Sequence, residues 1–131
     1  MRIFLGGTCN RSTWREELIT MLNTYDYFNP VVKDWTPECQ LEELRQREIC
    51  EYAVYVITPE MTGVYSIAEA VDSREKTVFC VHGDGFTPGQ LKSLEAVGKL
   101  IQRNGGTVCT TLNGLARFLN ERVQDGRHSE N

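Results

Sequence analysis

The strongest constraint in this sequence is the alternation of a short apolar run with a helix-like segment, which occurs five times along the chain. The clearest apolar run is "YAVYVIT" at residues 52–58, which carries no charged side chain. A strand without a polar face is typical of a parallel sheet that is covered by helices on both sides. The sequence therefore predicts an α/β flavodoxin-like open sandwich, with a five-stranded, mainly parallel sheet and helices on both faces.

The other expected elements follow from periodicity and from turn residues. Further strands are expected at residues 2–7, 25–30, 76–81 and 107–110. Helices are expected at residues 12–23, 37–51, 64–73, 89–106 and 111–123. Ser12 is the expected N-cap of the first helix, and Thr36 followed by Pro37 is the expected start of the second. Four apolar residues recur at helical spacing in the last helix: Leu112, Leu115, Phe118 and Leu119.

Length and composition predict one globular domain. The chain has 131 residues, of which 40% are hydrophobic and 24% charged, a size and balance typical of a single packed core. We expect the domain to occupy residues 1–124 and a polar tail at residues 125–131 to fray. We recognise no secretory signal and no apolar run of membrane-spanning length, so we expect a cytoplasmic protein.

The net charge and the cysteine pattern indicate which partners, metals and cofactors are expected. The formal net charge is −4, whereas nucleic-acid polymers are bound through clustered Lys and Arg, so we expect neither a nucleic-acid nor a membrane partner. The five cysteines are scattered without a C-x-x-C pair, and only His82 and His128 carry an imidazole. We therefore expect reduced thiols, no disulfide framework, no metal site and no cofactor.

Four loops are expected at the ligand-binding edge, because open parallel sheets bind ligands beyond the carboxyl ends of their strands. These loops are "GGTCNRS", "NPVVKDW", "TPEMTGV" and "HGDGF". In "GGT", the glycines allow backbone N–H groups to approach a phosphate or sugar, although the same residues suit a plain tight turn. In the second loop, Asp34 offers an acceptor, and Trp35 either stacks on a base or packs at the rim. His82 in the fourth loop fits a simple turn, and we leave it outside the site.

Glu69 is the main candidate for chemistry. On a helical wheel, the apolar residues of 64–71 point one way, while Tyr65, Glu69 and Asp72 gather beside them. Glu69 is thus expected beside the core face rather than in it, as a solvated helix residue or as a carboxylate that looks into the cleft. In the preceding helix, Glu43 and Arg47 are expected to form an i,i+4 ion pair.

The order "IFLGGT", "FNPVVKDW", a Glu-rich helix, "YAVYVITPEMTG" and "YSIAEA" resembles the nucleoside 2-deoxyribosyltransferase family, in particular its short, divergent branch. The resemblance covers roughly residues 2–81. It implies that a carboxylate attacks C1′ of the deoxyribose and holds the sugar as a covalent ester until another base or water takes it. It assigns this nucleophile to Glu69, and the acid that protonates the leaving base to Glu43, with Glu48 as the alternative.

The resemblance also implies where the substrate lies, and two features of this chain depart from the family pattern. The sugar would be lined by Gly6, Gly7 and Thr8, and the base pocket would be bordered by Asp34 and Trp35. The family has a second acidic residue shortly before the nucleophile, whereas this chain has no acid between Glu60 and Glu69. The missing acid would be replaced by the hydroxyls of Thr62, Tyr65 or Ser66. The glycine that usually follows the nucleophile is replaced by Ala70 and Val71.

The function implied by the resemblance is cleavage or exchange of the N-glycosidic bond of deoxynucleosides or their monophosphates. The ligand would be a small-molecule nucleoside or nucleotide, and a neighbouring subunit would complete the pocket in a homodimer or a larger homo-oligomer. Two other functions stay open. The missing acid favours a non-catalytic nucleotide-binding sensor of the same fold, and a TIR-like hydrolase that cleaves the nicotinamide bond of NAD also depends on a glutamate.

Overall fold

The sheet of this protein has five strands, all parallel, in the order β2-β1-β3-β4-β5. The computed structural model describes residues 1–9, 11–24, 26–32 and 34–129, with side chains as far as Val123. The strands are β1 (Ile3–Gly7), β2 (Tyr27–Phe28), β3 (Tyr52–Ile57), β4 (Thr77–Val81) and β5 (Thr107–Cys109). This order confirms the predicted flavodoxin-like sandwich, and the sheet is parallel throughout.

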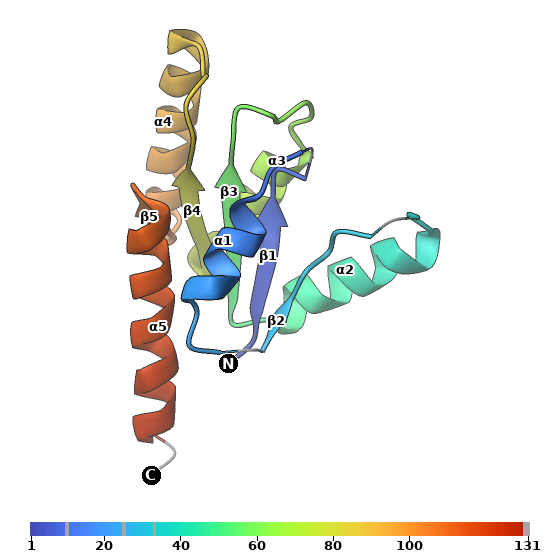
Figure 1. Ribbon diagram of the computed structural model, residues 1–131, viewed down its shortest axis with the longest axis vertical. Coiled ribbons are helices and arrows are strands. Elements are labelled where there is room, and N and C mark those ends of the chain that lie inside the picture. The colour runs from blue at the N-terminus through green and yellow to red at the C-terminus, as the bar shows by residue number, and fades with distance from the viewer. Residues whose placement is uncertain (10, 25, 33, 130–131) are drawn as a thin grey trace.

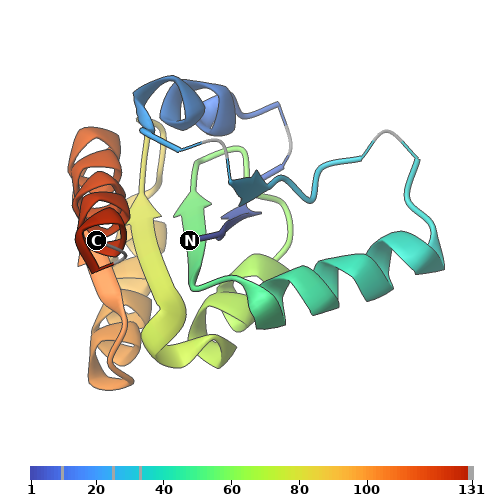
Figure 2. The ribbon, with the colours of Figure 1, turned by 90° about the horizontal axis from the view of Figure 1, so that it is seen from below.

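Helices cover both faces of the sheet. They are α1 (Trp14–Met21), α2 (Pro37–Ile49), α3 (Tyr65–Asp72), α4 (Pro88–Arg103) and α5 (Leu112–Ser129), with a short 3₁₀ turn, η1 (Arg74–Lys76). Helices α1 and α5 lie on one face, and α3 and α4 lie on the other (Figures 1 and 2). Helix α2 extends outward beside the sheet, so that its first turn lies farthest from the strands (Figure 2). None of the helices in the described residues has the length and apolar character needed to cross a membrane.

The core has two layers because successive residues of a strand point to opposite faces of the sheet. In β3, Val54 and Val56 pack toward α1 and α5, whereas Ala53, Tyr55 and Ile57 pack toward α3 and α4. All five of these side chains are fully buried. A strand buried on both faces has no place for a polar side chain, which explains the continuous apolar run in the sequence.

The strand order places the switch point between β1 and β3. The chain sets β2 on one side of β1 and β3 on the other, so the loops that follow β1 and β3 diverge and leave a crevice at their carboxyl ends. Gly7 is the last residue of β1 and is in register with Val56 of β3. The "GGT" and "TPEMTGV" loops therefore start from neighbouring strands at the same edge of the sheet, which is the edge where the sequence predicted the ligand-binding loops.

The turn that leaves β1 is tied to β3 and to α1 through Thr8. Its N–H donates to Val56 O at 2.9 Å, and its Oγ1 accepts from the N–H of Thr58 at 2.9 Å. Its carbonyl oxygen accepts from Ser12 Oγ at 2.8 Å, Trp14 Nε1 at 2.9 Å and Arg15 Nη1 at 2.7 Å. Thr8 itself is buried. One residue thus holds two strands and a helix together at the switch point.

The start of α1 differs from the prediction. The helix begins at Trp14 after Thr13, which makes no side-chain cap, and Ser12 is not the N-cap because its hydroxyl donates to Thr8 O. The expected cap of α2 is confirmed, since Thr36 Oγ1 accepts from the N–H of Cys39 at 3.2 Å and Pro37 follows it.

The end of the chain also differs from the prediction. Helix α5 continues to Ser129 rather than ending at Val123, so it takes in most of the segment expected to be a polar tail. The last two residues of that tail, and Tyr25 at the start of the expected second strand, lie outside the described residues.

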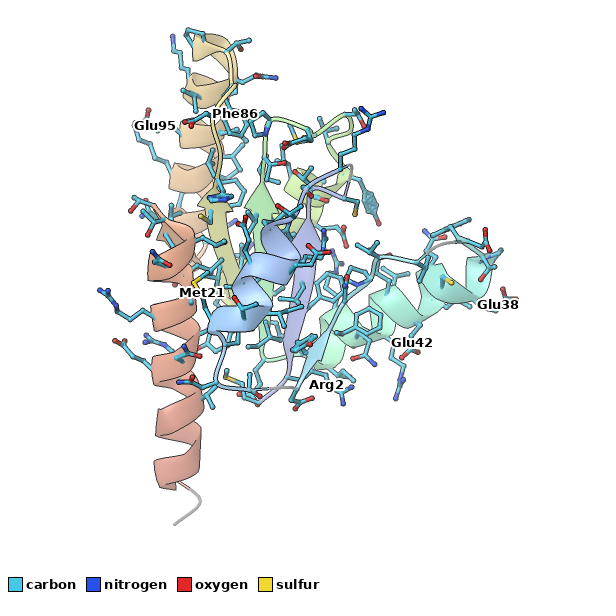
Figure 3. All side chains as sticks on the ribbon, in the orientation of Figure 1. Arg2, Met21, Glu38, Glu42, Phe86 and Glu95 are labelled. Carbon is cyan, nitrogen blue, oxygen red and sulfur yellow. The ribbon has the colours of Figure 1, made fainter. Side chains whose placement is uncertain are left out.

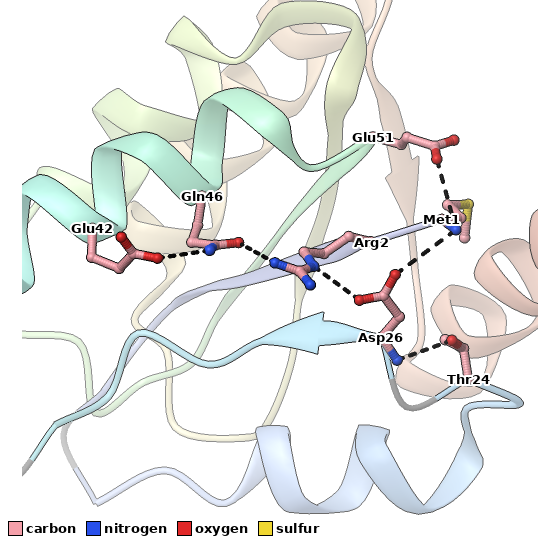
Figure 4. Close-up of polar contacts among 7 residues, drawn as sticks. All are labelled: Met1, Arg2, Thr24, Asp26, Glu42, Gln46 and Glu51. Carbon is pink, nitrogen blue, oxygen red and sulfur yellow. Dashed lines mark hydrogen bonds and ion pairs between the residues drawn. The ribbon is translucent and has the colours of Figure 1, made fainter.

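Helix α2 is attached to the amino end of β1 by a polar network (Figure 4). Arg2 donates to Asp26 Oδ1 at 2.9 Å and to Gln46 Oε1 at 3.1 Å, and Gln46 Nε2 donates to Glu42 Oε1 at 2.8 Å. Gln46 is buried, so this contact fixes the C-terminal half of α2. Glu38, at the other end of α2, lies well away from the sheet (Figure 3).

We expect Gly7→Ala to destabilise the fold, because Gly7 has φ +113° and a Cβ there would lie 2.3 Å from Val56 O. A left-handed conformation combined with a backbone clash should lower the free energy of unfolding by about 2 kcal/mol or more, measured by urea denaturation. Gly63→Ala is the matched control, since a Cβ at Gly63 meets nothing within 4 Å, and it should change stability by less than about 0.5 kcal/mol. Equal stability of the two variants would contradict this explanation of Gly7.

Candidate active site

Three adjoining cavities, of about 280, 220 and 160 Å³, lie at the carboxyl ends of β1 and β3. The first two share Trp35, Glu43 and Glu69, which places both candidate carboxylates in one cleft. The second and third share Gly7, Cys9 and Ser66. The cleft therefore runs from α2, over the end of β1, to the loop after β3.

Glu69 lies in the second turn of α3 and is only 7% exposed. The solvated alternative is therefore wrong, and the helical wheel underestimated the burial because it took no account of α2, which covers this side of α3. Burial raises the pKa of Glu69 to about 7, the nearby Glu43 and Asp72 raise it as well, and Arg47 opposes the shift. A carboxyl group that titrates near neutrality at the wall of a cavity is typical of a catalytic acid, base or nucleophile.

Glu43 is the partner carboxylate on α2. Its side chain is half-buried, and burial raises its pKa, with Arg47 and Arg15 acting in the opposite direction. The alternative acid, Glu48, is exposed and lines a different cavity, formed between the C-terminal ends of α2 and α3. The structure therefore pairs Glu69 with Glu43 and not with Glu48.

The expected Glu43–Arg47 ion pair is replaced by contacts across to α3. Among the described residues, Arg47 forms its ion pairs with Asp72, through Nη2 and Oδ2 at 2.8 Å, and with Glu69, through Nη1 and Oε2 at 3.7 Å. The two helices lie close enough for a side chain on α2 to reach α3, which sequence spacing alone does not predict. Arg47 thus neutralises part of the acidic charge around Glu69.

The "GGT" segment lines the cleft but offers fewer donors than expected. Gly6 and Gly7 line the cavity that contains Glu69, and Thr8 lines the neighbouring one. The N–H of Thr8 is already bonded to Val56 O, so this one donor is not available to a phosphate or sugar. The extension of β1–β3 pairing beyond Gly7 takes up this donor. Gly6 has a packing role, since a Cβ there would lie 2.6 Å from the ring of Tyr55.

The second loop contributes one of its two predicted residues. Trp35 is 61% exposed and lines both cavities that contain Glu69, which gives it an open aromatic face rather than a place in the rim packing. Asp34 is exposed and lines neither of these cavities, and its carbonyl oxygen lies near the thiol of Cys39, 4.0 Å from Sγ.

The predicted hydroxyl residues gather around the loop after β3. Tyr65 is 57% exposed and lines the first and third cavities, and Thr62 lines the third. Ser66 lines the second and third cavities. Its hydroxyl donates to Gly7 O at 3.2 Å, which connects α3 to the end of β1. Of the residues expected at the site, all but Asp34 therefore line one of the three adjoining cavities.

Arg15 is the site residue that sequence reasoning missed. It is buried, lines the same cavity as Glu43 and Glu69, and donates to Leu5 O at 3.0 Å and Thr8 O at 2.7 Å. Burial lowers its pKa, and its guanidinium is bonded to carbonyl oxygens rather than to a carboxylate. No feature of the sequence pointed to this role, because an arginine in an early helical turn is normally solvated.

Two further reactive side chains, Cys80 and His82, line none of the three cavities of the cleft. Burial raises the pKa of Cys80 to about 12, so it stays a thiol. His82 lies 3.5 Å from Glu17, between its Nε2 and Oε2, and lines none of the three cavities of the cleft. In the described part of the chain, no group of three or more His, Cys, Asp or Glu side chains is arranged to hold a metal ion.

Comparison with known families matches this geometry. The profile of proteins described as nucleoside 2-deoxyribosyltransferase like matches residues 1–84, the part of the chain that contains Glu43, Glu69 and all three cavities. The chain belongs to this family. No curated protein matches the chain.

Membership of the nucleoside 2-deoxyribosyltransferase-like family indicates a glycosyltransferase-like enzyme with a small-molecule nucleoside as ligand. The matched region ends at residue 84, just beyond β4. It therefore includes the switch point and the whole cleft. The elements outside it are β5, which is an edge strand of the sheet, and α4 and α5, which cover the two faces.

We expect Glu69→Gln to stabilise the protein at high pH. The folded-state pKa of Glu69 is about 7, above the ordinary value of 4.5, so the wild type loses stability as pH rises through this interval while the neutral amide does not. Between about pH 5 and pH 8 the variant should gain roughly 2 to 3 kcal/mol relative to the wild type, measured by urea denaturation at both values.

The control for this measurement is Glu95→Gln on α4, an exposed carboxylate on the opposite side of the molecule from α2 (Figure 3). It should show no pH-dependent difference from the wild type. A Glu69→Gln variant whose stability follows that of the wild type at both values would show that Glu69 titrates as an ordinary surface carboxyl.

Proposed function

We propose that this protein cleaves or exchanges the N-glycosidic bond of deoxynucleosides or their monophosphates through an ester between the deoxyribose and Glu69. The observation that carries the proposal is the buried Glu69 carboxyl, with a pKa of about 7, at the wall of a cavity that it shares with Glu43 and Trp35. Family membership supports a reaction of this class.

In the first half-reaction, the ionised Glu69 attacks C1′ of the sugar and forms a C–O bond. The C1′–N bond breaks, its electron pair goes to the base, and the base takes a proton from Glu43. A carboxylate is suited to this step because the oxocarbenium-like transition state develops positive charge at C1′. In the second half-reaction, Glu43 accepts a proton from water or from another base, which attacks C1′ and releases Glu69.

The two carboxyl groups share the proton that this reaction needs. The charge of Glu43 raises the pKa of Glu69, and the reaction requires one of the two carboxyl groups to be protonated while the other is ionised. The productive form has the charge on Glu69 and the proton on Glu43. The rate should therefore fall both when the pair gains a second proton and when it loses its only one.

The cleft suits the three parts of a nucleoside. The exposed face of Trp35 can stack on the base, because every base has a flat aromatic surface. The glycines of the "GGT" segment leave room for the sugar beside Glu69. Tyr65 and Ser66 each share a cavity with Trp35, and both also line the third cavity together with Thr62, where these residues supply polar contacts to the sugar or its phosphate.

We also propose that a second copy of this chain covers the outer face of α2. Leu41 is 68% exposed and Leu44 is exposed as well, and both lie on the helix that extends from the body of the protein. Trp35 and Leu44 also line the open cavity next to Glu69. A homodimer through this face would bury the leucines and close the cleft at the same time.

The catalytic proposal predicts that Glu69→Ala abolishes base release. The wild type, incubated with deoxynucleosides and their monophosphates with and without a second free base, should release or exchange the base, and the products are separated by chromatography. Loss of Glu69 should reduce the rate by at least about 10³-fold, and Glu43→Gln should reduce it by roughly 10² to 10⁴-fold because it removes only the proton donor.

The outcomes of this experiment separate the candidate functions. Exchanged bases indicate a transferase, and free sugar indicates an N-glycosidase. Nicotinamide released from NAD would favour the TIR-like alternative. Binding of nucleotides without turnover at any pH would contradict the catalytic proposal and favour the sensor.

The dimer proposal predicts that Leu41→Glu yields a monomer, because a charge at the centre of a buried apolar face is costly to desolvate. Light scattering coupled to size-exclusion chromatography gives the molar mass directly. Leu91→Glu on α4 is the control, since Leu91 is also exposed but lies on a different helix. A monomeric wild type would refute the proposal.

A further inference from the structure

Arg47 reaches Glu69 from behind the cleft. It does not line any of the three cavities that form the cleft, and it lines instead the cavity of about 380 Å³ between the C-terminal ends of α2 and α3. Its guanidinium is therefore placed to act on the Glu69 side chain without touching a ligand in the cleft. Leu44 lines both this cavity and the cavity of the cleft that contains Glu69.

The two contacts of Arg47 are unequal. The distance from Nη2 to Asp72 Oδ2 is 2.8 Å, which is a charge-assisted hydrogen bond, whereas the distance from Nη1 to Glu69 Oε2 is 3.7 Å. At 3.7 Å the cation still attracts the carboxylate strongly, but it does not occupy the oxygen lone pairs with a direct hydrogen bond. A tight pair with Asp72 and a loose pair with Glu69 stabilise the charge of Glu69 and leave its oxygen free to attack.

Several charged or titratable groups face Glu69 from the surrounding elements. They are Glu43 and Arg47 on α2, Asp72 on α3, Tyr55 on β3, Arg15 on α1 and Cys9 in the loop after β1. Of the two arginines, Arg15 is held by backbone carbonyls and lowers the pKa of Glu43, whereas Arg47 lowers the pKa of both Glu43 and Glu69. Arg47 is thus the arginine that acts on Glu69, and it forms an ion pair with that side chain.

We propose that Arg47, anchored by Asp72, is a positioning residue that stabilises the ionised form of Glu69. The inference rests on the proposed function of Glu69. Asp72 is 71% exposed at its side chain and holds the guanidinium from the solvent side, while Glu69 pairs with the other nitrogen from inside. Among the described residues, Arg47 forms its ion pairs with these two carboxylates, so its charge acts at short range on Glu69.

The anchoring also sets the distance between α2 and α3. Helix α2 is held on one side by Arg2, which donates to Gln46, and on the other by Arg47, which pairs with Asp72. Gln46 and Arg47 are neighbours in sequence, so the two contacts hold the same turn of α2 on two different sides. Glu43, one turn earlier, is thereby kept at the wall of the cleft opposite Glu69.

The test compares Arg47→Gln, Arg47→Lys and Asp72→Asn with the control Arg45→Gln, whose side chain is exposed and bonds to Glu42 on the same helix. Carbon-13 NMR of the glutamate carboxyl groups follows the titration of Glu69 in the protein alone, with the resonance assigned from Glu69→Gln. The midpoint should rise by about one pH unit in Arg47→Gln, rise less in Arg47→Lys, which keeps the charge, and stay unchanged in Arg45→Gln.

The Asp72→Asn variant distinguishes two roles of Asp72: holding Arg47 in place, and acting on Glu69 directly through its own charge. Asp72 raises the pKa of Glu69 by its own charge, so a role through charge alone predicts that the midpoint falls in this variant. The proposal predicts that the midpoint rises, because a released Arg47 no longer stabilises Glu69. A fall would overturn the anchoring role, and an unchanged midpoint in Arg47→Gln would overturn the whole inference.

The pH profile of kcat/KM supplies a second readout, on the substrate that the wild type turns over. The acidic limb should move to higher pH in Arg47→Gln by the same amount as the NMR midpoint, with activity recovered at higher pH. A loss of kcat/KM by the same factor at every pH would indicate that Arg47 has only a structural role. If the wild type shows no turnover, the proposed function is refuted, but the effect of Arg47 on the titration of Glu69 is not. If the wild type shows turnover and the midpoint is unchanged in Arg47→Gln, only the inference about Arg47 is refuted.

Discussion

The structure depends on the hydrogen bonds that gather around Thr8. This one residue closes the end of the β1–β3 pair and receives the side chains of the first turn of α1, and the neighbouring Gly7 O receives Ser66 from α3. Two strands and two helices are thus fixed to one another at the carboxyl edge of the sheet. The cleft is formed where these elements meet, so its floor is as rigid as the sheet itself.

The burial of Glu69 lowers the stability of the folded protein once its carboxyl group ionises, and a neighbouring cation offsets part of this loss. A buried carboxyl beside a second carboxyl destabilises the folded protein above neutral pH, and Arg47 offsets part of this by its charge. Arg47 is itself kept charged, since Tyr55, Glu69 and Asp72 raise its pKa although burial alone would lower it. The same helix that supplies Arg47 also supplies Glu43, so the placement of α2 controls both the acid and the charge of the site.

The elements of the fold could be predicted because they depend on local pattern. The apolar run in β3 and the Thr36–Pro37 start of α2 each constrain the local structure strongly. The failures came where a distant partner decided the outcome. Ser12 has the residue type of an N-cap, yet its hydroxyl donates to Thr8 O, and Arg47 has the spacing of an i,i+4 partner of Glu43, yet it reaches α3.

The sequence by itself determined the strand and helix order, the edge at which a ligand is expected to bind and the candidacy of Glu69, since these follow from periodicity, from the rules for parallel sheets and from motif order. Only the tertiary structure decided that Glu69 is buried, that Glu43 rather than Glu48 lies beside it, and that Arg15 and Arg47 stand close to the pair. The physical reason is that burial and charge depend on distances between segments that are remote in the chain, and these distances exist only once α2 is placed against α3.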